Sequence, residues 1–205
     1  MTTLVIARHG NTFGPGDVVT RVGGRTDLPL TEAGLEQGRK LGAYLREHAL
    51  LPSVIYTSQL RRTLQTAAMA QQEMGLAVPL VPLDMFNEID YGPDENQPEA
   101  AVVARLGADA LRAWDMDTIV PPGWLVDVEG IRNAWSAFGL QLVQEHAGST
   151  VLVVTSNGIA RFAPVLTGDF EGFKARQNLK IATGALCRFE YADDGWTVAT
   201  WNLKP

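Results

Sequence analysis

The stretch Thr3–Thr12, "TLVIARHGNT", begins with an apolar run and then places an arginine, a histidine and a glycine side by side. Thr3–Ala7 predicts a buried strand, so Arg8, His9 and Gly10 stand where that strand ends. A histidine at such a place can be a core residue, a metal ligand, a general base or a nucleophile. The remainder of the chain decides among these roles.

Outward from this stretch, short apolar runs alternate with longer helical patterns. Further strands are predicted at 53–58 ("SVIYTS"), 78–83 ("VPLVPL") and 150–156 ("TVLVVTS"); in the last, the unbroken run Val151–Val154 indicates burial on both faces. Helices are predicted over Glu32–Ala49, Ser58–Met74, Glu99–Trp114, Val128–His146 and Gly158–Leu166, with Thr31 and Ser58 as the N-caps of the first two. Two alternating runs around "ADDG" at 192–195 predict a β-hairpin.

This alternation predicts a three-layer α/β/α sandwich with a mainly parallel sheet and an antiparallel edge. We expect a single domain over residues 1–205, with an insertion of loop and helices at about 87–127.

Composition narrows the class of protein. The chain has 205 residues, a formal charge of −6 and one cysteine, Cys187, which excludes an intrachain disulfide and a cysteine-based zinc site. We expect a cytoplasmic protein, because the N-terminus has no basic leader and no segment is long enough to span a membrane. The acidic charge argues against nucleic acid as a partner but leaves room for a small phosphorylated molecule in a locally positive pocket. The oligomeric state stays open between a monomer and a homodimer.

Three predicted strand ends carry unusual residues: "RHGNT" at 8–12, "TSQLRRTLQTA" at 57–67 and "TSNGIAR" at 155–161. Ligands of open α/β sheets bind at the carboxyl ends of the strands. The first two ends bring arginines to the same rim, and a guanidinium matches phosphate oxygens in a bidentate manner. The sequence therefore predicts a pocket for a phosphoryl group.

"RHGNT", followed by "PLTEAG" and "SQLRRTLQTA", resembles the histidine phosphatase superfamily, which has the phosphoglycerate mutase-like fold. "FNEIDYG" lies where that family keeps its acid, and "VLVVTSNGIAR" aligns with its last motif. The resemblance implies that His9 is the nucleophile, that Arg8 and Arg62 bind the phosphate oxygens, and that Glu88 protonates the leaving oxygen, with Asp90 as the next candidate acid. It further implies that Asn11 and Thr12 support the pocket, and that no metal or cofactor takes part.

The sequence departs from this family at Ser156, where relatives have a second histidine that binds the transferring phosphoryl group. His48 and His146 lie near the ends of predicted helices that run back from the strand ends just described. Such helices end at the opposite edge of the sheet, so both histidines are badly placed to replace the missing one. Ser156 can donate one neutral hydrogen bond but brings no positive charge, and the loss of one such donor costs ~10²–10³ in rate. The candidates to compensate for the missing histidine are Asn157, Arg161 and the N-terminus of the helix predicted at Gly158–Leu166. At Gly23 relatives often carry a glutamine, which we interpret as a change in the leaving-group contacts.

The acidic segment "EIDYGPDEN" at 88–96 predicts a rim that repels anions and therefore a neutral or cationic leaving group. Relatives that are mutases have basic residues there, so a phosphoglycerate mutase-type phosphotransferase is the weaker alternative. The sequence favours a phosphomonoester hydrolase that acts through a phosphohistidine. The rival is a degenerate module that still binds phosphate but has lost turnover. Trp114, Trp124 and Trp135 are interpreted as packing anchors, Arg61 as a solvated helix residue and Cys187 as an inert strand residue.

Overall fold

The computed structural model describes residues 1–193 and 195–205. Its centre is a six-stranded sheet in the order β3-β2-β4-β1-β5-β6. The strands are β1 (Thr2–Arg8), β2 (Val54–Thr57), β3 (Leu80–Pro82), β4 (Thr150–Thr155), β5 (Leu186–Ala192) and β6 (Gly195–Leu203). Strands β1 to β4 run parallel, and β5 pairs antiparallel with both β1 and β6. This confirms the predicted mainly parallel sheet with an antiparallel edge. The predicted hairpin is formed by β5 and β6, but Asp194 of its "ADDG" turn lies outside the described residues.

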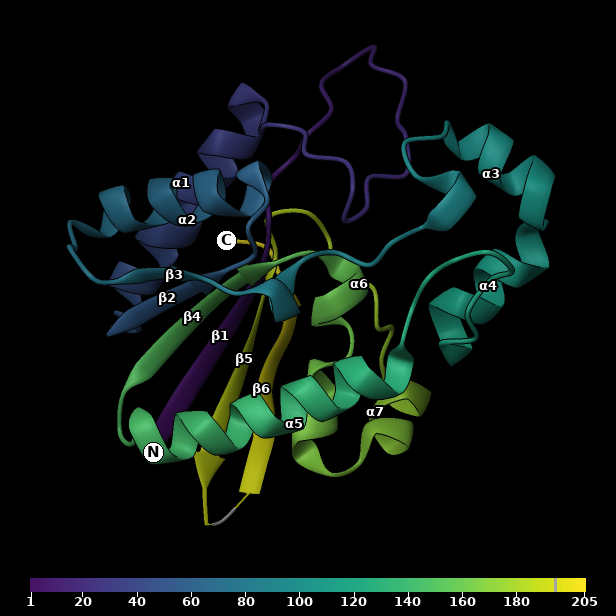
Figure 1. Ribbon diagram of the computed structural model, residues 1–205. Helices are drawn as coiled ribbons and strands as arrows, with labels where there is room; N and C mark the ends of the chain where they lie inside the picture. Colours follow the sequence, from purple (N-terminus) through teal and green to yellow (C-terminus); the bar gives the residue numbers. More distant parts are fainter. Residues whose placement is uncertain (194) are drawn as a thin grey trace.

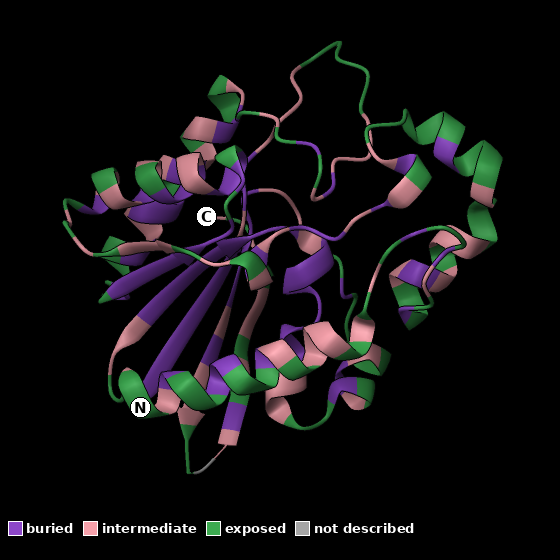
Figure 2. Ribbon diagram, viewed as in Figure 1, coloured by how far each residue is buried: buried purple, intermediate pink, exposed green. Residues whose placement is uncertain are grey.

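Helices cover both faces of the sheet (Figure 1). One face carries α1 (Glu32–Glu47) and α2 (Arg61–Met74), and the other carries α5 (Val128–Glu145), α6 (Asn157–Ala160) and α7 (Phe170–Arg176). Each face has its own apolar core: Leu41, Leu45 and Ile55 belong to the first, and Trp135 and Phe162 to the second. The central strands β1 and β4 are buried along most of their length, as the unbroken apolar runs predict (Figure 2).

Helix α1 begins where the sequence predicts, because the Thr31 hydroxyl accepts the Gly34 N–H at 3.1 Å. It then packs unusually close to α2. A Cβ added at Gly42 would lie 2.4 Å from the Ala70 carbonyl oxygen, so a glycine is required at that contact.

Three predicted helices differ from the structure. Ser58 is not an N-cap: α2 begins at Arg61, and the Ser58 hydroxyl instead contacts the Leu60 N–H at 3.2 Å and the Thr63 hydroxyl at 2.6 Å. The helix predicted over Glu99–Trp114 is two helices, α3 (Glu99–Leu106) and α4 (Ala108–Asp117), because Gly107 has a φ of 79°. The helix predicted over Gly158–Leu166 is the single turn α6 followed by a 3₁₀ turn, Ala163–Thr167.

Two chain segments outside the sheet pair with each other beside its carboxyl edge: residues 13–31 and residues 84–127, which include α3, α4 and the 3₁₀ turns Asp84–Phe86 and Gly92–Asp94. The Arg21 N–H donates to the Gln97 carbonyl at 2.9 Å, and the Asn96 N–H donates to the Arg21 carbonyl at 2.8 Å. We call these two segments together the cap. That residues 87–127 are an insertion into a single domain stays a prediction.

Candidate active site

The carboxyl ends of β1, β2 and β4 lie side by side, because β4 pairs with both other strands: Arg8 is in register with Thr155, and Thr57 with Val154. His9, Ser58 and Ser156 follow these ends directly. A cavity of about 590 Å³ opens between this edge and the cap. The predicted site residues that line it are Arg8, His9, Asn11, Thr12, Glu88 and Asn157.

The His9 ring is fixed by the backbone around it. Its Nδ1 lies 2.7 Å from the Gly10 carbonyl oxygen, which can only accept a hydrogen bond. In the neutral ring, Nδ1 therefore carries the proton, and Nε2 keeps a lone pair. The His9 backbone is held in turn by the Thr155 carbonyl at 3.0 Å and the Gly184 N–H at 3.1 Å. A Cβ at Gly10 would lie 2.3 Å from the Gly34 carbonyl oxygen, so this turn needs glycine.

The surroundings of His9 favour its neutral form. Burial lowers the pKa of His9 well below its ordinary value, and the positive charges of Arg8 and Arg62 lower it further. The side chain is only 6% exposed. At neutral pH the ring is thus an uncharged imidazole with a free nitrogen lone pair, the form that a nucleophile requires.

Arg8 and Arg62 each brace a loop and keep a buried N–H without a protein partner. Arg62 is fully buried, and its Nη1 and Nη2 donate to the carbonyls of Thr26 at 2.7 Å and Gly23 at 3.2 Å. Arg8 donates from Nη1 to the Ile181 carbonyl at 2.6 Å. The Nε of each arginine is buried and has no hydrogen-bond partner among the residues that the structure describes. Arg8 lines the cavity, whereas Arg62 is not among its lining residues.

Glu88 lies buried against the start of α6. Its Oε1 accepts the Ile89 N–H at 2.9 Å, and its Oε2 accepts the Gly158 N–H at 3.2 Å. Burial raises the pKa of Glu88, although these hydrogen bonds and the charges of Arg62 and Arg8 oppose the rise. A Cβ at Gly158 would lie 2.2 Å from Oε1, so the glycine of "TSNG" lets the carboxyl group approach the backbone.

Ser156 is fully buried at the end of β4, and its hydroxyl has no hydrogen-bond partner within the described residues. It does not line the cavity, which its neighbour Asn157 does. The Asn157 side chain accepts the Ile181 N–H at 2.8 Å. The structure thus brings Ser156 beside the site with an uncommitted hydroxyl, and brings Asn157 into it.

Arg161 follows helix α6 directly and contacts the cap. Its Nη2 donates to the carbonyls of Trp114 at 2.9 Å and Asp115 at 2.6 Å in the last turn of α4, and its guanidinium lies 4.6 Å from the Trp114 ring centroid. It is fully buried and does not line the cavity. Only Nη2 holds the cap, and among the described residues Nε and Nη1 have no hydrogen-bond partner, so compensation by Arg161 at the phosphoryl group stays a prediction.

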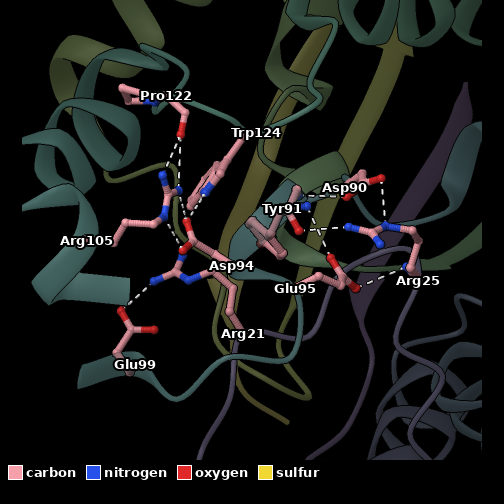
Figure 3. Close-up of polar contacts among 11 residues, drawn as sticks. Arg21, Arg25, Asp90, Tyr91, Asp94, Glu95, Glu99, Arg105, Pro122 and Trp124 are labelled. Atoms are coloured by element: carbon pink, nitrogen blue, oxygen red, sulfur yellow. Dashed lines mark hydrogen bonds and ion pairs between the residues drawn. The ribbon is translucent and has the colours of Figure 1, made fainter. Parts of the chain in front are cut away.

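The acidic segment does not form the anion-repelling rim that the sequence predicts (Figure 3). Asp90 pairs with Arg25 at 2.9 Å, and Asp94 binds Arg105 and the Trp124 indole N–H. Glu95 accepts hydrogen bonds from the N–H groups of Gly23 at 3.0 Å and Arg25 at 3.1 Å. Among these acids, Glu88 alone lines the cavity. The prediction failed because Asp90 and Glu95 are bound by residues 23–25 and Asp94 by Arg105 and Trp124.

Gly23 has a structural reason that the sequence does not reveal. A Cβ there would lie 2.2 Å from the Glu95 carboxylate and 2.6 Å from the Tyr91 ring. The glycine thus makes room for Glu95, and the interpretation of Gly23 as a change in leaving-group contacts stays a prediction.

Sequence reasoning missed several residues of the cavity wall. Tyr91 lines it, and burial raises the pKa of this phenol, so the hydroxyl stays protonated beside Glu88. Arg21 also lines it, paired with Glu99 and placed 5.4 Å from the Tyr91 ring centroid. Tyr91 lies in the segment "FNEIDYG", which was expected to supply the acid, so its position in that segment could have indicated that it lines the site. Trp114 both packs in the core and lines the cavity, whereas Trp124 and Trp135 belong to the core.

The remaining histidines lie as the sequence predicts. His48 and His146 follow the last residues of α1 and α5, and His146 contacts the Tyr56 hydroxyl at 3.2 Å. In the described parts of the chain, no cluster of three or more histidine, cysteine or acidic side chains is placed to hold a metal ion. No helix of residues 1–193 and 195–205 is long and apolar enough to cross a membrane.

Comparison with known proteins identifies the family of this chain. The chain belongs to the histidine phosphatase superfamily (branch 1), whose family model matches residues 4–204. It is 27% identical over its whole length to an uncharacterized phosphatase, PhoE, of Bacillus subtilis, of which it covers 96%. It is 32% identical over 61% of its length to the 2,3-bisphosphoglycerate-dependent phosphoglycerate mutase of Clavibacter sepedonicus, but this match spans only 49% of the mutase.

A solved structure shares the fold. YhfR of Bacillus stearothermophilus superimposes with a TM-score of 0.79 over 98% of this chain and 97% of that one, at 24% identity. At this identity the likeness supports the architecture alone.

Proposed function

We propose that this protein hydrolyses phosphomonoesters through a phosphohistidine at His9. The observation that carries the proposal is the imidazole itself, buried and neutral, with Nδ1 bonded to the Gly10 carbonyl and Nε2 free. The likeness to a phosphatase over the full length of both chains supports the same class of reaction.

In the first step, the Nε2 lone pair attacks phosphorus while the bond from phosphorus to the leaving oxygen breaks. Glu88 gives its proton to that oxygen, which its raised pKa allows. The phosphorylated ring is positive, and its Nδ1–H stays bonded to the Gly10 carbonyl. Arg8 and Arg62 stabilise charge on the equatorial oxygens.

In the second step, water attacks phosphorus, and the phosphorus–Nε2 bond breaks. The Glu88 carboxylate takes the proton from the water, so that His9 and Glu88 both return to their starting states. The Ser156 hydroxyl supplies at most one neutral hydrogen bond to the phosphoryl group. We therefore propose a slower hydrolase than one with a second histidine.

The rival function is phosphate binding without turnover. The observation that favours it is Ser156, which is buried, uncharged and set back from the cavity wall. This module would keep Arg8, Arg62 and a neutral His9 and would bind a phosphoryl group without transferring it.

An activity assay with 4-nitrophenyl phosphate separates the two functions. The wild type and the control His48→Ala should both hydrolyse it, because His48 lies at the far end of α1. His9→Ala should show only background hydrolysis. Turnover by His9→Ala would exclude the covalent route. Absence of turnover in the wild type, with phosphate still bound, would favour the binding module.

A further inference from the structure

The cavity is far larger than a phosphoryl group requires. Its volume of about 590 Å³ falls in the range of pockets that hold whole organic ligands. The groups proposed to react with or bind the phosphate are Arg8 and His9, at the carboxyl end of β1, and Glu88, buried against the start of α6. Most of the remaining wall comes from the cap, and this part of the cavity would contact the leaving group.

Much of that outer wall is apolar. Its apolar and aromatic members come from both cap segments: Phe13, Val19, Val22, Tyr91, Leu111 and Trp114. Val19 is 56% exposed, and its neighbour Val18, which does not line the cavity, is 69% exposed. Such a wall gains free energy from covering apolar surface of a ligand.

The charged groups of the outer wall are largely neutralised by the protein itself. Arg21 is paired with Glu99 and stacked beside Tyr91 and Trp124 (Figure 3). The Asp115 carboxylate lies 3.6 Å from the buried Arg161.

Lys180 is the remaining cation of the wall. It is exposed, and an exposed ammonium contributes little binding energy. A leaving group that carries a carboxylate would therefore lose its hydration without gaining a strong partner.

We infer that the leaving group is a neutral alcohol with a bulky apolar or aromatic body, and not a small hydroxy acid. This inference rests on the proposed function, since it names the substrate class of the same site. The preference for a neutral leaving group then comes from the apolar wall, because Asp90, Asp94 and Glu95 are paired within the cap.

The test is a series of n-alkyl monophosphates from ethyl to hexyl phosphate. Their leaving alcohols have nearly equal basicity, so a change of rate along the series reports contact with the wall and not bond chemistry. We expect kcat/KM to rise about two- to fourfold per methylene, the factor that corresponds to burial of each group. 3-Phosphoglycerate and phosphoserine should fall below butyl phosphate. A kcat/KM that does not change along the series, or that is higher for 3-phosphoglycerate and phosphoserine, would overturn the inference. A preference for these acids would indicate that Lys180 binds the carboxylate of the leaving group.

Binding of n-alkylphosphonates, measured by calorimetry, separates this inference from the proposed function. These compounds have no bond that the enzyme can hydrolyse. If the protein turns over no phosphomonoester, the hydrolase proposal fails, yet tighter binding with chain length would still support the apolar leaving-group site. Affinity that does not depend on chain length would contradict it, whatever the activity.

Two pairs of matched variants locate the effect. Leu111→Asn should reduce the hexyl-to-ethyl ratio of kcat/KM about tenfold, whereas Met116→Asn, on the same helix α4 but 61% exposed and away from the cavity, should leave it unchanged. Val19→Asn should likewise lower the ratio, and its neighbour Val18→Asn should not. The Val19 pair lies in a loop and keeps the test valid if the helix variant folds poorly. Equal ratios within both pairs would show that the wall does not contact the leaving group.

Discussion

At the scale of single residues, Glu88 links burial to proton transfer. Its raised pKa keeps part of the carboxyl population protonated above the ordinary range for glutamate, and a general acid needs this form. The population is lost as pH rises through the folded pKa. For an alkyl phosphate, kcat/KM should therefore fall on the alkaline side.

Glu88→Gln tests this role. In this variant, the fall of kcat/KM at alkaline pH should disappear, and ethyl phosphate should be hydrolysed ~10²–10⁴-fold more slowly. It should affect kcat/KM for 4-nitrophenyl phosphate far less, because nitrophenolate leaves without a proton. Equal losses on both substrates, measured as pH–rate profiles, would argue against Glu88 as the acid and favour a structural role at Gly158.

Ser156 is the residue whose substitution says most about the rate. If the Ser156 hydroxyl donates a hydrogen bond to the phosphoryl group, Ser156→Ala should lower kcat. The free energy of unfolding should stay the same or rise slightly, because the variant loses a buried hydroxyl that has no partner among the described residues. Ser156→His should raise kcat by up to ~10²–10³, unless the larger ring overpacks this buried position, at a cost of about 1–3 kcal/mol. Urea unfolding distinguishes the two outcomes. Full activity in Ser156→Ala would remove the hydroxyl from the mechanism.

At the scale of elements, Arg161 connects the segment after β4 to helix α4 of the cap. Because it holds the carbonyls of Trp114 and Asp115, we assign it a positioning role for the leaving-group wall. Arg161→Met should raise KM for hexyl phosphate several-fold with a smaller change in kcat, and should destabilise the protein by about 1–3 kcal/mol. Arg112→Met, on the exposed side of α4, is the control. A loss of kcat alone, equal for short and long substrates, would contradict this role.

The elements also show what the sequence can and cannot predict. Strands β1 and β4 were predictable because unbroken apolar runs require burial on both faces, and "RHG" and "TSNG" then had to follow strand ends at one edge. The break at Gly107 and the start of α2 at Arg61 were not, because local preferences do not say which glycine breaks a helix or which serine caps one. The partners of Asp90 and Glu95 depend on how residues 13–31 pack against 88–98, and those of Asp94 on how Arg105 and Trp124 pack onto it, which no local pattern encodes.

At the scale of the whole molecule, an acidic chain with a net charge of −6 places two arginines, Arg8 and Arg62, close enough to His9 to lower its pKa. A phosphate bound there stabilises the folded state alone, so inorganic phosphate at 100 times its Kd should add about 2.7 kcal/mol to the free energy of unfolding. Arg8→Met should lose most of this gain, whereas Arg39→Met, on the exposed face of α1, should keep it. The comparison is made by urea unfolding with and without phosphate. An equal gain in both variants would place the bound phosphate elsewhere.

The central claim is covalent catalysis by His9, and trapping the intermediate tests it most directly. The wild type is mixed with 4-nitrophenyl phosphate and quenched in alkaline denaturant, which preserves phosphohistidine. It is then digested, and the phosphate is located by mass spectrometry. We predict phosphate on His9, formed and lost at least as fast as kcat, and none in His9→Ala. Steady turnover without a phosphorylated His9, or phosphate on another residue that keeps pace with turnover, would contradict the account.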